Sequence, residues 1–127
     1  MNYNYSSMKT LTKAEETIMK VLWKMQSGLL MEIVENMLLP KPHKNTVATI
    51  LKTLSDKGFV KVENIGRIHR YHPIVSKEQY SNNTLTNVAK GYFNGSFSSV
   101  VSFLVNEEKL SVKDLELLLR QLQKNKK

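Results

Sequence analysis

Two prolines, Pro40 and Pro42, interrupt the first half of the chain and force it to turn between two helical patterns. Each proline lacks a backbone donor and disfavours the helical conformation of the residue before it. We therefore predict a helix that begins at about residue 43 and runs to residue 57, where Gly58 ends it. One side of this helix is apolar at helical spacing and is expected to pack on a core; its members are Val47, Ile50, Leu51 and Leu54.

Two more helices are predicted before this turn. Thr12 and Glu15 match a capping box, and an apolar stripe then continues to Ser27-Gly28. The stripe comprises Ala14, Ile18, Val21, Leu22 and Met25.

A shorter second helix is indicated by two apolar pairs at i and i+4 spacing, formed by Ile33, Val34, Met37 and Leu38. The second helix has no polar cap at Leu29 or Leu30, which leaves Ser27 as the nearest candidate.

Residues 59–63 and 68–72 are rich in β-branched and aromatic side chains and are predicted to form two short strands. Asn64-Ile65-Gly66-Arg67 separates them, which gives a hairpin with a basic tip. The order helix, helix, turn, helix, hairpin is that of a winged helix-turn-helix domain. In such a domain the third helix enters the major groove and the hairpin, or wing, lies along the DNA backbone.

The outer side of the third helix carries short polar side chains, whereas a merely solvated helix face more usually carries long Lys and Glu. At 100° per residue, the face opposite the apolar stripe is formed by Asn45, Thr49, Lys52 and Asp56, flanked by Thr46, Ala48 and Thr53. Asn45, Thr46 and Thr49 are predicted to meet base edges or the adjacent phosphate. Lys52 is predicted to reach a phosphate or a guanine, and Lys44 a phosphate at the helix N-terminus.

The positive charge is concentrated in one block of the chain. Of 19 basic and 11 acidic residues overall, residues 41–75 hold seven basic residues and only two acidic ones, Asp56 and Glu63. Arg67, Arg70 and Lys61 are predicted to place charge from the wing on the DNA backbone; the alternative is an ordinary solvated basic surface. The other basic residues of the block are Lys41, Lys44, Lys52 and Lys57.

Three further helices are predicted after Pro73. The first is indicated by the apolar residues Tyr80, Leu85, Val88, Ala89, Tyr92 and Phe93. It is predicted to end at Asn94-Gly95-Ser96. Ser111 is the predicted N-cap of the last helix. They carry more apolar surface than so short a segment can bury alone, so we expect pairing with a second copy. The predicted dimerisation residues are Val100, Val101, Phe103, Leu104, Leu115, Leu118, Leu119 and Leu122. The predicted organisation is a mostly α chain with a small β-hairpin wing: a winged-helix DNA-binding domain over 9–75 and a three-helix dimerisation domain over 76–127.

Several classes of function are disfavoured. The chain has no Cys, which removes disulfides, thiol nucleophiles and thiolate metal sites. His69 and His72 are three apart on a strand and His43 lies at a helix start, so no metal and no cofactor is predicted. No paired carboxylates, Ser-His-Asp order or Gly-rich phosphate loop suggests an enzyme. Trp23 and Tyr71 lie in apolar patterns and are predicted to be packing residues. No apolar run or signal peptide is visible, so a cytoplasmic protein without membrane insertion is expected.

Four segments resemble one family of regulators. They are KPHKNTVATILKTLSDKGFV at 41–60, LTKAEETIMKVLW at 11–23, GRIHRYHP at 66–73 and YFNGSFSSVVSFL at 92–104. In this order they resemble the penicillinase and methicillin-resistance repressors, the BlaI/MecI family, and the resemblance covers about residues 9–124.

This resemblance implies a homodimeric repressor that binds a palindromic operator in double-stranded DNA, typically of a β-lactam-resistance operon. It also implies inactivation by proteolysis, triggered by a membrane sensor metalloprotease. The cleaved bond maps onto Ser102-Phe103, where the best-known members have Asn in place of Ser102. The copper-responsive branch carries a cysteine-rich tail, which this chain lacks. Two alternatives stay open: a regulator of unrelated genes with no β-lactam-linked sensor, and a winged-helix module used for protein contact.

Overall fold

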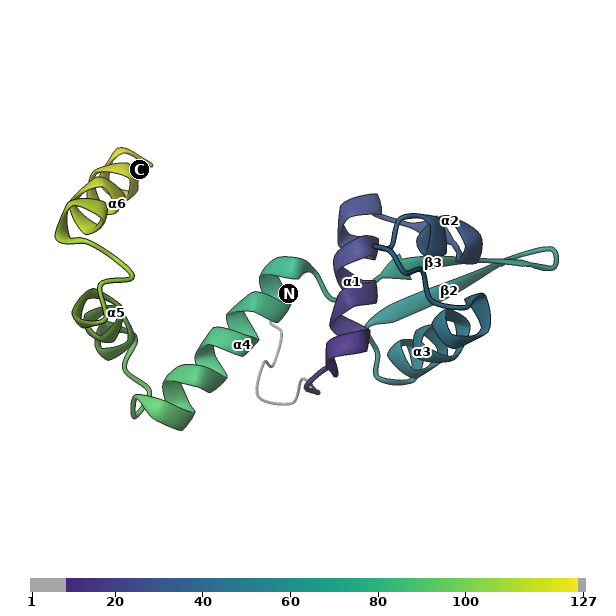
Figure 1. Ribbon diagram of the computed structural model, residues 1–127, viewed down its shortest axis with the longest axis horizontal. Helices are drawn as coiled ribbons and strands as arrows, with labels where there is room; N and C mark the ends of the chain where they lie inside the picture. Colours follow the sequence, from purple (N-terminus) through teal and green to yellow (C-terminus); the bar gives the residue numbers. More distant parts are fainter. Residues whose placement is uncertain (1–8, 126–127) are drawn as a thin grey trace. The chain divides into compact units, whose positions relative to one another are not determined.

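The computed structural model describes residues 9–125 (Figure 1). Contacts divide the chain into two compact units, with the division between Asn83 and Thr84. The chain is mostly helical with one small antiparallel sheet, which confirms the predicted fold class. The division falls inside a helix, a few residues after the domain boundary predicted at 75/76.

The N-terminal unit contains three helices packed with a three-stranded sheet. Its elements are α1 (Lys13–Met25), β1 (Gly28–Leu29), α2 (Leu30–Glu35), α3 (Lys44–Asp56), β2 (Val60–Ile65), β3 (Ile68–Pro73) and the first turns of α4 (Lys77–Tyr92). The strand order is β1-β3-β2, and both pairings are antiparallel. Figure 1 shows the β2–β3 hairpin projecting beyond the helices, as a wing does.

One apolar core holds this unit together. It buries side chains from all three helices, from the sheet and from the start of α4, and the removal of this apolar area from water is the main stabilising term. Its fully buried members include Ile18, Met19, Leu22, Ile33, Val47, Leu51, Leu54, Phe59, Val60 and Val75.

The predicted capping box of α1 is confirmed: Thr12 Oγ1 accepts from Glu15 N at 3.1 Å, and Glu15 Oε1 accepts from Thr12 N at 2.8 Å. The predicted apolar stripe needs one correction. Ala14 is exposed, whereas Met19 is buried, because the inward face of α1 is centred on Ile18.

The start of the sheet was not predicted. α1 ends at Met25 with Gln26 in the left-handed region (φ 73°), and Gly28–Leu29 then pair with β3. Gly28 is buried, and a Cβ at this position would lie 2.6 Å from Met25 Cε and 3.3 Å from Ile33 Cγ1. Glycine therefore allows the chain to pass closely beneath α1.

The second helix is shorter than its apolar pattern indicates. α2 ends at Glu35, and Asn36 follows as its C-cap with φ −90° and ψ 3°; the Asn36 side chain donates to the carbonyl of Glu32 at 2.8 Å. Met37 and Leu38 therefore lie beyond the helix to which they were predicted to belong. Met37 is half-buried against the core, whereas Leu38 is 89% exposed. The start has no capping side chain at Leu29; instead Glu32 Oε1 accepts from Leu29 N at 2.8 Å.

The C-terminal unit contains the rest of α4, α5 (Phe97–Asn106) and α6 (Val112–Asn125). The predicted break after α4 is confirmed, since Asn94 and Gly95 both have positive φ. Ser96 caps α5 by accepting from Ser99 N, and Ser111 caps α6 by accepting from Asp114 N. No helix within residues 9–125 is both long and apolar enough to cross a membrane.

Candidate DNA-binding interface

The recognition helix predicted over 43–57 is α3, and the core holds it firmly. Val47, Leu51 and Leu54 are fully buried and Ile50 is half-buried, as the sequence pattern predicted. At its end, Phe59 N donates to the carbonyl of Leu54 and the chain turns into β2. The apolar side of α3 thus fixes which side is left for a ligand.

An ion pair also holds α3 from its C-terminal end. Lys57 Nζ lies 2.7 Å from Glu15 Oε1, and the two side chains are 20% and 7% exposed. Burial raises the pKa of Glu15, but hydrogen bonds from Lys57 and Thr12 together with the Lys57 charge outweigh it, so the net pKa is lowered. Lys57 is one of the seven basic residues of the block 41–75, but its ammonium group pairs with Glu15 and does not contribute a free charge for a ligand.

The outer side of α3 is exposed and polar. Its predicted DNA-contacting residues, Lys44, Asn45, Thr46, Thr49 and Lys52, are all exposed. No described residue makes an ion pair with Lys44 or Lys52 within 4.0 Å, so their charges are available to a ligand.

The helix start is capped by an imidazole, which the sequence analysis missed. His43 Nδ1 accepts from Asn45 N at 3.0 Å, so the neutral ring carries its hydrogen on Nε2. His43 is itself exposed. No usual capping residue stands at this position, so the capping preferences of Ser, Thr, Asp and Asn gave no signal for it.

Two of the three threonines on the outer side, Thr49 and Thr53, donate to the helix backbone. Thr49 Oγ1 donates to the carbonyl of Asn45 at 3.0 Å, and Thr53 Oγ1 donates to that of Thr49 at 3.2 Å. With its hydrogen used in this way, the Thr49 oxygen is left as an acceptor, beside an exposed methyl group. Such a side chain can accept from a base amino group or pack on a thymine methyl.

The wing turns sharply between its strands. Ile65 pairs with Ile68, so Gly66 and Arg67 form a two-residue turn, and Gly66 has a φ of 63°. A positive φ at the first turn position is the geometry of a type II′ turn, where glycine is favoured. Arg67 therefore lies at the tip of the hairpin, and it is exposed.

The register of the wing places its basic side chains on one face. Lys61 pairs with His72, and Glu63 with Arg70, on the side opposite the buried Val60 and Tyr71. Lys61 is exposed, whereas Arg70 is half-buried and its Nη1 donates to Ser27 Oγ at 3.3 Å. Of the three predicted wing contacts, Arg70 is thus the one fixed to the protein.

The wing histidines lie on opposite faces, as predicted from their spacing. His72 Nε2 contacts Glu63 Oε1 at 2.9 Å, and His69 Nδ1 contacts Asn64 Oδ1 at 2.6 Å. Within the part of the chain that the structure describes, no three His, Cys, Asp or Glu residues converge on a possible metal position.

The predicted dimerisation residues all lie in the C-terminal unit, and none is fully buried there. Val101, Phe103, Leu118, Leu119 and Leu122 are exposed, at between 37% and 66%. Val100, Leu104 and Leu115 are half-buried. Val112 and Leu117 of α6 are also exposed apolar side chains.

The bond between Ser102 and Phe103 lies in the middle of α5. Both residues are exposed, and the Phe103 ring packs edge-on against Phe93 with the ring centroids 5.6 Å apart.

Comparison with known proteins agrees with this architecture. Residues 11–124 match the family model described as "Penicillinase repressor". The methicillin resistance regulatory protein MecI of Staphylococcus aureus strain N315 is 26% identical over 115 residues, which span 90% of this chain and 94% of that protein. The penicillinase repressor of Bacillus licheniformis is 25% identical over 117 residues, or 91% of each chain. The chain therefore belongs to the penicillinase repressor family, and it is a DNA-binding transcriptional repressor rather than an enzyme.

Proposed function

We propose that the protein represses transcription as a homodimer, with α3 of each copy in the major groove of one half of a palindromic operator. The observation that carries this proposal is the outer side of α3. This side is exposed and carries mostly short polar side chains. The core and the Lys57–Glu15 pair hold the helix in a fixed position. Rigid presentation matters because base-edge contacts discriminate only when the side chains are held in position.

Each residue of this face has a role suited to its chemistry. Asn45 offers an amide that can bind a base edge, and Thr49 offers an acceptor and a methyl group. Thr46 meets the adjacent base or phosphate. Lys44, in the first turn of α3, binds a phosphate where the helix dipole also favours negative charge. Lys52 reaches a phosphate or a guanine from the next turn.

The wing supplies contacts to the backbone. Arg67 at the exposed tip and Lys61 on the outer face of the hairpin carry free charges. Arg70 adds a charge whose position is set by its hydrogen bond to Ser27. These contacts position the protein on the duplex and give salt dependence, while α3 gives sequence preference.

Dimerisation is proposed to use the apolar side chains of α5 and α6. No residue of α5 is buried within a single chain, although six of its ten residues are Val, Phe or Leu. Such a surface is stabilised when a second copy covers it. Two copies with two-fold symmetry match a palindrome of the same symmetry.

The regulated genes are proposed to form a β-lactam-resistance-type operon, and the inducing step is proteolysis in the C-terminal unit. Two relatives support this assignment, since the name of MecI refers to methicillin resistance and that of the Bacillus licheniformis protein to a penicillinase. The proposed cut is between Ser102 and Phe103, made once a membrane sensor metalloprotease is activated. Because the bond lies within α5, local opening of this helix must precede cleavage.

The DNA-binding proposal is tested by selection from a pool of randomised duplexes. We expect an inverted repeat to be enriched, with binding about 10³-fold or more tighter than to a scrambled duplex. Enrichment of a single half-site without a repeat would contradict the dimeric arrangement. If no sequence is enriched, the domain does not read DNA sequence, and the alternative of a winged helix used for protein contact is favoured.

The proteolysis proposal is tested separately by intact-mass analysis of the repressor from cells before and after β-lactam exposure. A pair of fragments that meet at Ser102/Phe103 is expected. An intact chain after exposure would favour a regulator of the same family with another inducer.

A further inference from the structure

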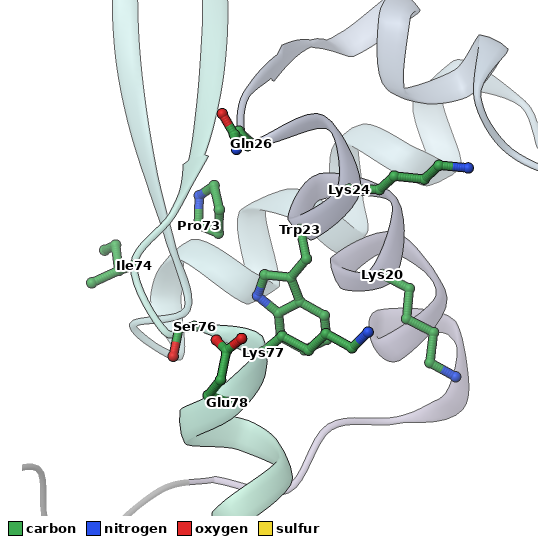
Figure 2. A pocket seen from close by; sticks show the side chains of 9 residues that line it. All are labelled: Lys20, Trp23, Lys24, Gln26, Pro73, Ile74, Ser76, Lys77 and Glu78. Atoms are coloured by element: carbon green, nitrogen blue, oxygen red, sulfur yellow. The ribbon is translucent and has the colours of Figure 1, made fainter. Parts of the chain in front are cut away.

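A groove lies on the N-terminal unit between α1, the end of β3 and the first turn of α4 (Figure 2). Its volume is about 780 Å³, which is within the range of about 300–1,000 Å³ typical of small-molecule sites. None of the residues proposed to contact DNA lines it. Its lining residues are Lys20, Trp23, Lys24, Gln26, Pro73, Ile74, Ser76, Lys77 and Glu78.

The floor of the groove is aromatic and fixed. Trp23 lies at its centre in Figure 2, half-buried, and its Nε1 donates to the carbonyl of Val75 at 2.9 Å. The indole also packs against Tyr80, with the ring centroids 6.0 Å apart. Pro73 and the 57% exposed Ile74 extend the apolar surface beside it. A flat apolar group can therefore be placed against the indole without reorganising it.

The rim of the groove is positively charged. Lys20 and Lys24 extend from α1 on one side of Trp23, and Lys77 comes from the first turn of α4. Glu78 is the one acidic residue of the lining, so the rim carries an excess of two positive charges. Among the described residues, no carboxylate lies within 4.0 Å of any of these three ammonium groups. Their charges are available to an external anion.

We propose that this groove binds a small organic anion that combines a flat apolar body with carboxylate groups. The body stacks on Trp23 and beside Pro73, while the carboxylates meet Lys20, Lys24 and Lys77. A dianion is favoured because it matches the charge excess of the rim. This binding does not depend on the proposed operator contacts, since the two sets of residues are separate.

Trp23 is the only tryptophan of the chain, so its fluorescence reports on this groove directly. Phthalate serves as the dianionic probe, benzoate as the monoanion with the same aromatic ring and phthalamide as the neutral analogue. We expect saturable change in the Trp23 emission with phthalate, weaker binding of benzoate and none of phthalamide. Equal binding of phthalamide, or no saturable change with phthalate, would overturn the proposal.

A charge-matched pair of variants locates the binding. The triple variant Lys20→Gln, Lys24→Gln, Lys77→Gln should bind phthalate about tenfold more weakly, since three exposed ion pairs are lost. The control Lys13→Gln, Lys90→Gln, Lys109→Gln removes the same charge from exposed positions outside the groove and should bind normally. Equal loss in both variants would show a non-specific charge effect and refute the site. If only the triple variant of Lys20, Lys24 and Lys77 loses affinity for duplex DNA, these lysines bind DNA phosphates and the proposal of a small-anion site is contradicted.

Discussion

Lys57 Nζ lies 2.7 Å from Glu15 Oε1, and this ion pair joins the C-terminal end of the recognition helix to the first turn of α1. The same carboxylate closes the α1 capping box by accepting from Thr12 N. One buried side chain thus fixes a helix start and the position of a second helix. The pair thus helps to position the face of α3 that we propose reads the DNA, although Glu15 belongs to α1.

The pair should stabilise the fold measurably. Glu15→Gln keeps the hydrogen bond to Thr12 but removes the charge that Lys57 meets, so the free energy of unfolding should fall by about 1–3 kcal/mol in urea titrations. Glu35→Gln is the control, because Glu35 is exposed and its side chain pairs with no described residue; it should change stability by less than about 0.5 kcal/mol. Equal effects of the two substitutions would show that the pair does not stabilise the protein.

The contribution of Glu15 should depend on pH in a defined direction. Its pKa in the folded chain is lowered below the ordinary value of 4.5, so the unfolded chain binds its proton first as the pH falls. The stabilisation is therefore complete above about pH 5 and is lost as the pH falls through the lower folded pKa. Unfolding free energies of the native chain and of Glu15→Gln, measured from neutral pH downwards, should converge as the pH falls through the lowered folded pKa of Glu15. A constant difference would contradict the lowered pKa.

Backbone contacts of the wing should appear in the salt dependence of operator binding. Arg67→Gln should reduce the slope of log affinity against log salt by about 1.8, because the dimer loses one phosphate contact from each of its two wings and each contact contributes about 0.9. Lys90→Gln, an exposed change in α4, should leave the slope unchanged. If Arg67→Gln leaves the slope unaltered, the tip of the wing does not touch the DNA backbone.

The apolar face of α6 should control assembly. The double variant Leu118→Asp, Leu122→Asp should sediment as a 14.6 kDa monomer, because two carboxylates cannot be buried in an apolar interface. Leu38→Asp is a demanding control, since Leu38 is 89% exposed but lies in the N-terminal unit. It should leave the dimer intact. Dissociation by Leu38→Asp alone would place the interface elsewhere.

Much of the fold was predictable because it follows from local patterns. The α1 capping box and the prolines before α3 each act within a few residues, and the structure has them as predicted. The wing turn is tighter than predicted, because Asn64 and Ile65, which were expected between the strands, belong to β2. Short elements were harder. β1 has only two residues, too few for any periodicity. α2 ends at Glu35, three residues before the end of the apolar pattern that suggested Leu38.

Long-range pairs of the site could not be predicted from the sequence alone. Lys57 and Glu15 are 42 residues apart, and Arg70 and Ser27 are 43 apart, so only the folded chain brings them together. The outer face of α3 was predictable, because helical geometry alone determines what lies opposite a buried stripe.

The capping box formed by Ser76 and Gln79 at the start of α4 could also have been predicted from the sequence, but it was missed.

The central claim is that Thr49 and its neighbours on α3 read the operator, and the discrimination between selected and scrambled duplexes tests it most directly. Thr49→Trp is compared with Thr17→Trp, since Thr17 is also an exposed helical threonine whose hydroxyl donates to the backbone four residues earlier. We predict that Thr49→Trp brings the affinity ratio close to one while the protein stays dimeric, and that Thr17→Trp retains a ratio of about 10³ or more. A full ratio in Thr49→Trp would contradict the account.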